Sequence, residues 1–178
     1  MSTIAIDPGK TTGIALYLGG PSSPIVASWV DPTSVEILAF LRWAKGAGFT
    51  TVVIEDQHLP RPRVVRGSIK WRLNWPNLQT LIRGAARWMT CAEIVGMRVE
   101  FIKPAEWQGP MLGKSSDLST KQLCSKVVAE TWVTVRRWHP AKGEAVGDAQ
   151  LVKVDRLNEH IRDAIMMGRW WMLYGGAR

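Results

Sequence analysis

The sequence predicts an α/β fold, in which a five-stranded mixed sheet is flanked by helices. Five short apolar segments have the length and β-branched content of buried strands. Segments with helical periodicity separate the later ones, and a helix between two buried strands favours a parallel pair. The close spacing of the first two strands favours an antiparallel pair instead. The expected strands cover residues 4–6, 13–17, 24–30, 50–54 and 98–102.

The first three strands are expected to form a meander, with the turn Pro8–Thr12 between the first two. Thr33 and Glu36 have the spacing of a capping box, which predicts a helix from this point to about Lys45, ended by Gly46 and Gly48. The strand 50–54 is reached through that helix. We therefore expect it to lie parallel to the first strand.

Residues 59–75 alternate basic side chains with proline, glycine and tryptophan and lack helical periodicity, which predicts an exposed basic loop. Pro76 suits the first turn of a long helix that runs to about residue 96. The apolar arc of this helix covers roughly half of its circumference, wider than the ~100° stripe of an ordinary surface helix. We expect helix 77–96 to pack against both the core and a second copy of the chain, as a homodimer.

The C-terminal third is expected to contain a connector, two helices and a loop. Residues 108–118 are rich in glycine, proline and serine, which predicts a connector. Ser119 and Gln122 then have capping-box spacing before a helix to about Trp132. Residues 138–147 are expected to be a loop. The last helix is expected to end at about residue 173 and to begin at Asp148 or Asp155, each of which suits an N-cap.

The 178 residues, 46% of them hydrophobic, are enough for one core, so we expect a single domain over residues 1–178. The formal charge of +8 attracts polyanions, which makes nucleic acid the first expected partner. An acidic membrane surface is the second, although no basic amphipathic helix supports it. Two cysteines fit a reducing compartment and the first residues lack a signal-peptide pattern. These features indicate a cytoplasmic protein.

Acidic residues follow two of the expected strands. Asp7 ends the first strand and Glu55 ends the fourth, and parallel neighbours place both carboxylates at one edge of the sheet, where ligands of open α/β sheets bind. His160 and Asp163 are spaced to share one face of the last helix. Such a group could hold two divalent cations ~3.5–4 Å apart, the arrangement that promotes phosphodiester hydrolysis.

The segments around these residues resemble the RuvC family of Holliday-junction resolvases, which have an RNase H-like fold. The resemblance rests on Ile6–Gly13 (IDPGKTTG), Val53–Glu55 (VIE) and His160–Ile165 (HIRDAI). It implies a homodimeric endonuclease that nicks two strands of a four-way DNA junction symmetrically, with two Mg²⁺ or Mn²⁺ ions in each active site. By position, it implies Asp7, Glu55, His160 and Asp163 as the catalytic and metal-binding residues.

Three departures from the family pattern mark a divergent member. Most members have a carboxylate where His160 stands; an imidazole suits Mn²⁺ better than Mg²⁺, or could act as general base on the attacking water. The turn between Asp7 and Gly13 is one residue shorter than usual. The family's junction-probing phenylalanine is replaced by His58, so stacking on bases could have moved to His58, Trp71 or Trp75.

Basic residues of the loop and of a second segment are the expected nucleic-acid contacts. Ser119–Leu123 is similar to the family's helix start whose lysine approaches DNA, which implies Lys121 as a substrate contact. The expected contacts are His58, Arg61, Arg63, Arg66, Lys70, Arg72, Lys114 and Lys121.

Several alternatives stay open. Asp7 before Pro8–Gly9 could be a turn residue, and the basic loop could be a solvated surface. The function could be cleavage of other branched DNA or structured RNA, or nucleic-acid binding without catalysis. A P-loop is excluded because Ile4 stands where its first glycine is required, and the cysteines lack the spacing of a zinc site. Acids that compete with the chosen ones are Asp56, Asp148, Asp155 and Glu159.

Overall fold

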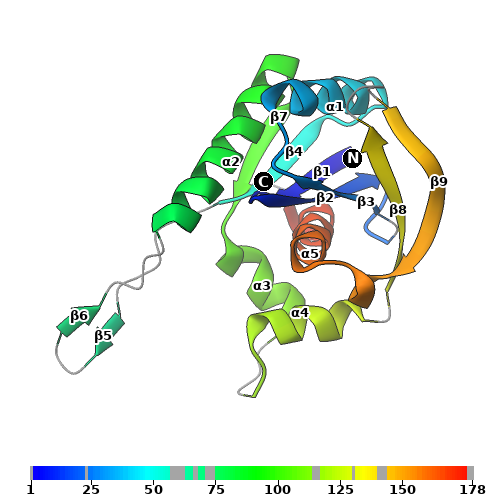
Figure 1. The fold of residues 1–178 in the computed structure, drawn as a ribbon. Coiled ribbons are helices and arrows are strands. Elements are labelled where there is room, and N and C mark those ends of the chain that lie inside the picture. The colour runs from blue at the N-terminus through cyan, green and yellow to red at the C-terminus, as the bar shows by residue number, and fades with distance from the viewer. Residues whose placement is uncertain are drawn as a thin grey trace.

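The computed structural model describes residues 2–22, 24–56, 63–65, 68–70, 75–113, 117–129, 131–139 and 144–175. A mixed sheet of seven strands, in the order β7-β4-β1-β2-β3-β8-β9, forms its centre (Figure 1). The strands are β1 (Ser2–Asp7), β2 (Thr11–Leu18), β3 (Ile25–Val30), β4 (Thr51–Glu55), β7 (Arg98–Ile102), β8 (Trp132–His139) and β9 (Glu144–Lys153), with a separate pair, β5 (Arg63–Val65) and β6 (Ser68–Lys70). The helices are α1 (Ser34–Gly46), α2 (Trp75–Val95), α3 (Pro104–Leu112), α4 (Thr120–Val128) and α5 (Glu159–Tyr174), with a 3₁₀ turn, η1, at Val154–Arg156.

The strand pairing confirms the predicted mixed sheet. β1 pairs antiparallel with β2 and parallel with β4, and β4 pairs parallel with β7. Because β1 pairs directly with β4, their ends lie next to each other at one edge of the sheet. The predicted cap of α1 is also present, since the Glu36 amide donates to Thr33 Oγ1 at 3.3 Å and the Thr33 amide donates to Glu36 Oε2 at 2.7 Å.

The sheet is covered on both faces because its central strands are apolar on both sides. Ile4 and Ile6 pack with α1 and α2 on one face, while Ala5 and Val53 pack with α5 on the other. Asp7 follows Ala5 by two residues and Glu55 follows Val53 by two. Strand alternation therefore places both carboxylates on the face that α5 covers.

The first turn of α5 lies directly on β2, at Gly13. A Cβ atom at Gly13 would lie 2.1 Å from the carbonyl oxygen of His160 and 2.6 Å from the amide nitrogen of Ile161, so no larger residue fits without a shift of the helix. Gly168 makes a similar close approach farther along α5, where a Cβ would lie 2.4 Å from the ring of Tyr17. The depth at which α5 packs, and with it the position of His160, thus depends on glycine.

The main sheet has seven strands instead of the predicted five because β8 and β9 form a further antiparallel pair. The prediction of a helix to Trp132 is wrong: α4 ends at Val128, and Trp132 begins β8. The prediction of a loop over 138–147 is also wrong, because β8 and β9 continue into that range. The alternating Val133 and Val135 favour a strand, and β8 pairs with β3, a strand more than 100 residues earlier in the chain. Such a distant partner leaves no local pattern in the sequence.

Three smaller predictions also need correction. The connector expected at 108–118 begins inside α3, which has Pro104 in its first turn and tolerates Pro110 near its end. Part of the expected basic loop is the β5–β6 hairpin. The N-cap of α5 is Asn158, whose side chain accepts from the Ile161 amide at 2.9 Å; Asp148 lies in β9 and Asp155 in η1. In the described part of the chain, no helix combines the length and apolarity that crossing a membrane requires.

Candidate active site

Asp7 is the most deeply buried acidic residue of the described chain, with 5% of its surface exposed at the end of β1. Its Oδ2 lies 2.7 Å from Nδ1 of His160, which comes from the first turn of α5. Because Asp7 is paired with Gly13 in the β1–β2 ladder, the close approach of α5 at Gly13 brings His160 above the end of β1.

Glu55 ends β4, next to Asp7. Its carboxyl group is hydrogen-bonded to that of Asp7, and its Oε1 accepts from the indole Nε1 of Trp107 at 3.3 Å. Trp107 is fully buried in α3. The packing of α3 against the sheet therefore fixes the position of the Glu55 carboxylate.

The helix α4 holds the start of α5 through three contacts. The buried thiol of Cys124 is hydrogen-bonded to the Asp163 carboxyl group. Ser125 Oγ accepts from Arg162 Nη1 at 2.6 Å, and Lys121 forms an ion pair with Glu159. Asp163 thus faces the same site as His160, one helical turn farther on.

The charges of the cluster are only partly compensated. Burial raises the pKa of Asp7, and the hydrogen bond from His160 opposes that rise. Burial and the nearby charge of Asp7 raise the pKa of Asp163 to about 6. The hydrogen bond to Asp7 raises the pKa of His160. Several carboxyl groups therefore compete for little positive charge, which is a setting that favours the binding of a cation.

The donor set fits a divalent cation. Carboxylate oxygens are the ligands that Mg²⁺ and Mn²⁺ prefer, and an imidazole nitrogen is compatible with Mn²⁺. Among the residues that the structure describes, no three His, Cys, Asp or Glu side chains stand in an arrangement that would already hold a metal. In this arrangement His160 Nδ1 is bonded to Asp7 and, when protonated, supplies the nearest positive charge.

The structure brings together Asp7, Glu55, His160 and Asp163, the four residues that the resemblance implies. Lys121 lies near them, paired with Glu159. Arg63 and Lys70 lie in the β5–β6 hairpin, and Trp75 begins α2 with 56% of its surface exposed. The other expected contacts, His58, Arg61, Arg66, Trp71, Arg72 and Lys114, lie outside the described residues.

Trp107 and Cys124 contact the cluster without having been predicted from the sequence. Trp107 lies in a segment whose only helical signal is Pro104 after a strand, with Glu106 two residues later. Cys124 has no partner cysteine and no metal-site spacing, so its contact with Asp163 follows only from the packing of α4 on α5.

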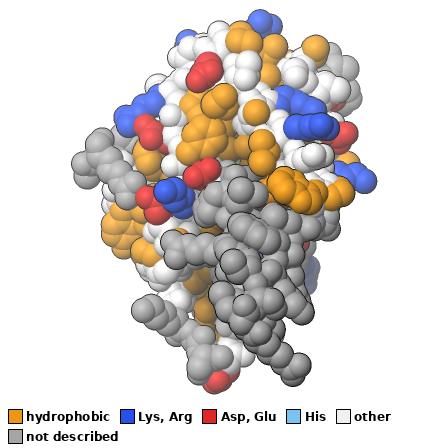
Figure 2. All heavy atoms as spheres, turned by 90° about the vertical axis from the view of Figure 1, so that its left-hand side faces the viewer, with side chains coloured by type: hydrophobic (Ala, Val, Ile, Leu, Met, Phe, Trp, Pro, Cys, Tyr) orange, Lys and Arg blue, Asp and Glu red, His pale blue; other side chains and the backbone are white. Residues whose placement is uncertain are grey.

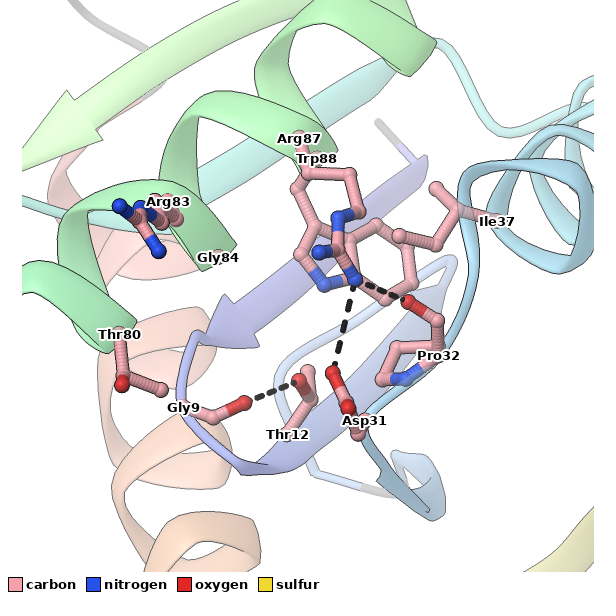
Figure 3. A pocket seen from close by; sticks show the side chains of 10 residues that line it. All are labelled: Gly9, Thr12, Asp31, Pro32, Ile37, Thr80, Arg83, Gly84, Arg87 and Trp88. Atoms are coloured by element: carbon pink, nitrogen blue, oxygen red, sulfur yellow. Dashed lines mark hydrogen bonds and ion pairs between the residues drawn. The ribbon is translucent and has the colours of Figure 1, made fainter.

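A second hollow lies behind the β1–β2 turn, on the α2 side (Figure 3). It has a volume of about 210 Å³ and is lined by Gly9, Thr12 and Arg83 among others. Figure 3 shows Arg87 reaching from α2 to Asp31 and Pro32, which it contacts at 3.6 Å and 2.6 Å. The guanidinium group of Arg87 is therefore already bound by groups of the protein itself.

Comparison with solved structures finds a likeness to RuvC of Thermus thermophilus. A structure described as T. thermophilus RuvC in complex with Holliday junction substrate aligns over 99% of this chain and 96% of its own, with a TM-score of 0.59 and 12% identity. A second T. thermophilus RuvC structure covers the same shares at 12% identity, with a TM-score of 0.52. The chain has the RNase H-like fold of RuvC. No protein-family profile and no curated protein sequence matches it.

Proposed function

We propose that this protein is a metal-dependent DNA endonuclease that resolves four-way junctions by paired, symmetric nicks, and that residues 1–178 form one nuclease domain. The observation that carries the proposal is the meeting of Asp7, Glu55 and Asp163 with His160 at one edge of the sheet. The RuvC-like fold and the net charge of +8 support a nucleic-acid substrate.

The site residues have distinct roles in the proposed reaction. Asp7, Glu55 and Asp163 would hold Mg²⁺ or Mn²⁺, which lowers the pKa of an attacking water and stabilises charge on the leaving 3′-oxygen. Trp107 and Cys124 keep two of these carboxylates in position through their hydrogen bonds. When Nδ1 of His160 donates to Asp7, its Nε2 is the acceptor of the neutral ring and can take a proton from water.

Lys121 and the β5–β6 hairpin supply the proposed contacts to the phosphate backbone. The ion pair between Lys121 and Glu159 is exposed, and exposed pairs contribute only about 0–1 kcal/mol. Lys121 can therefore exchange this carboxylate for a phosphate at little cost. The hairpin projects from the body of the molecule, beside the start of α2 (Figure 1).

Symmetric nicks require two copies of the site, and we propose that α2 forms the dimer contact. Ile82 and Ile94 of α2 are 47% and 63% exposed. Between α1 and α2 lies a mostly apolar hollow of about 400 Å³. Figure 2 shows hydrophobic side chains gathered on this side of the molecule, bordered by charged ones. An apolar patch rimmed by charges is typical of a protein interface.

Replacement of single carboxylates tests the proposal. Asp7→Asn and Glu55→Gln keep the shape of each side chain but remove its charge, so cleavage of a four-way junction should fall by about 10²-fold or more. Junction binding in EDTA should change little, because it depends on the basic surface.

The matched control is Asp56→Asn, which changes the acid next to Glu55 in the chain. This variant should cleave at the rate of the unmodified protein. If Asp7→Asn or Glu55→Gln also cleaves at that rate, the site is wrongly assigned.

A further inference from the structure

The β8–β9 hairpin creates an open groove on the far side of α5 from the catalytic cluster. The groove has a volume of about 580 Å³ and lies between β3, β8 and the segment that leads into α5. In Figure 1 this hairpin flanks α5 on the side opposite to α2 and the β5–β6 pair. Its lining residues are Ser28, Val135, Arg136, Arg156, Leu157, Asn158 and Ile161.

Two arginines give this groove its charge. Arg136 and Arg156 are both exposed, and neither makes a hydrogen bond or ion pair with another described residue. Among the described residues that line the groove there is no acid, and the nearby Asp155 is 3.5 Å from Lys153, with which it forms an ion pair. The first turn of α5, with its positive dipole end, lies beside the two arginines. The groove therefore offers two guanidinium groups that no other described residue pairs with, and these suit an anion such as a phosphate.

An irregularity in the β8–β9 ladder lies beside Arg136. Val135 pairs with Gln150 but Arg137 pairs with Val146, so the extra residues of this bulge belong to β9, opposite Arg136. Bulges are common next to functional sites.

The groove and the catalytic cluster are linked by residues that pair across three neighbouring strands of the sheet. Asp7 pairs with Gly13 of β2, and Gly13 pairs with Ser28 of β3, which lines the groove. Neighbouring strands are ~4.8 Å apart, so the backbones of Asp7 and Ser28 are about 10 Å apart. The first turn of α5 lies on Gly13, between these two residues. The groove and the catalytic cluster are therefore on opposite sides of the start of α5.

We propose that Arg136 and Arg156 bind a backbone phosphate of the cleaved DNA strand, on the other side of the start of α5 from the scissile phosphate. The inference rests on the proposed function, because it takes nucleic acid as the substrate. It assigns to the β8–β9 hairpin the task of holding the strand on the side of the site opposite to the β5–β6 hairpin.

The first test measures the salt dependence of binding to a fluorescent four-way junction in EDTA. The variants are Arg136→Gln, Arg156→Gln and both together, with Arg42→Gln on the exposed side of α1 as the matched control. Each lost phosphate contact should reduce the slope of log K against log salt by about 1, while Arg42→Gln should leave it unchanged. Thermal unfolding of each variant should match that of the unmodified protein, because both arginines are exposed.

The second test locates the contact on the DNA. Single neutral methylphosphonate linkages are placed one to five nucleotides from the cleavage site on either side. One position, on one side of the cleavage site only, should weaken binding of the unmodified protein severalfold but have no further effect on the double arginine variant.

The outcomes separate this inference from the proposed function. If the unmodified protein cleaves the junction and the arginine variants behave like Arg42→Gln, the groove assignment is overturned and the function stands. If the arginine variants lose binding as described but no metal supports cleavage, the groove is supported and the nuclease proposal fails. If the protein does not bind the junction at all, both are overturned.

Discussion

His160 lies within a group of acids, so its protonation changes the charge of the site. Its ring is bonded to Asp7 through Nδ1, which raises the pKa of the histidine. A neutral imidazole can bind Mn²⁺ or accept a proton, whereas an imidazolium competes with a cation for Asp7. Catalysis should therefore depend on the identity of this one side chain.

We expect His160→Asp to retain Mg²⁺-supported cleavage, because aspartate supplies an oxygen ligand in the same place. His160→Ala should lose about 10²-fold or more, since it supplies neither a ligand nor a base. Single-turnover cleavage of a four-way junction with each metal measures both rates. An alanine variant with undiminished cleavage would make the histidine purely structural.

The raised pKa of Asp163 predicts how the free energy of unfolding depends on pH in the absence of metal. The pKa of its carboxyl group is 3.8 in the unfolded chain and about 6 in the folded one. Between these two pH values the folded protein therefore keeps a proton on Asp163 that the unfolded chain has lost. Stability should therefore fall as the pH rises from about 4 to above 6, by on the order of 3 kcal/mol for this group. His160 acts in the same direction, because its raised pKa favours the folded state below about 6.5 and that stability is lost as the pH rises through its folded pKa.

Urea unfolding in EDTA at pH 4.5 to 8 measures this dependence. Asp163→Asn is the matched variant. Its stability should change less over the range, because it lacks the Asp163 carboxyl group while Asp7 and His160 still titrate. An equal pH slope in the two proteins would contradict the assigned cause.

The position of α5 depends on its contact with β2 at Gly13. In Gly13→Ala, the new methyl group would meet the His160 carbonyl at 2.1 Å, so the helix must move away from the sheet. We expect the variant to lose about 1–3 kcal/mol of stability and most of its cleavage, because His160 moves with the helix. Gly46→Ala, where nothing lies within 4 Å, is the control and should reduce neither stability nor cleavage.

Urea unfolding and single-turnover cleavage measure the two effects on the same preparation. Normal cleavage by a folded Gly13→Ala protein would show that the depth of α5 does not control the site.

Local signals explain which elements could be predicted. The caps of α1 and α4 require residues only three positions apart, and both are present as predicted. The positions of Asp7 and Glu55 at the ends of two expected parallel strands likewise indicated that both lie at one edge of the sheet. By contrast, β8 is stabilised by pairing with β3, whose residues are more than 100 positions away, and α4 meets Asp163 through Cys124 across 39 positions. Such contacts depend on the assembled fold, so no short window of the sequence contains them.

At the scale of the whole molecule, the β5–β6 pair and the β8–β9 strands lie on opposite sides of α5 (Figure 1). The proposed function requires a nucleic-acid strand that contacts both of them to cross the catalytic cluster at the start of α5. This arrangement, rather than any single residue, is what the proposed function requires of the fold.

Cleavage of an immobile four-way DNA junction, beside a linear duplex of the same sequence, is the most direct test of the central proposal. Each substrate is incubated with Mg²⁺, Mn²⁺ or EDTA, and the cut positions are mapped on all strands. We expect paired symmetric nicks in the junction alone, and only with metal, since two copies of the site act on one substrate. Tight binding of the junction without a nick under any metal would contradict the nuclease assignment and leave a nucleic-acid-binding module.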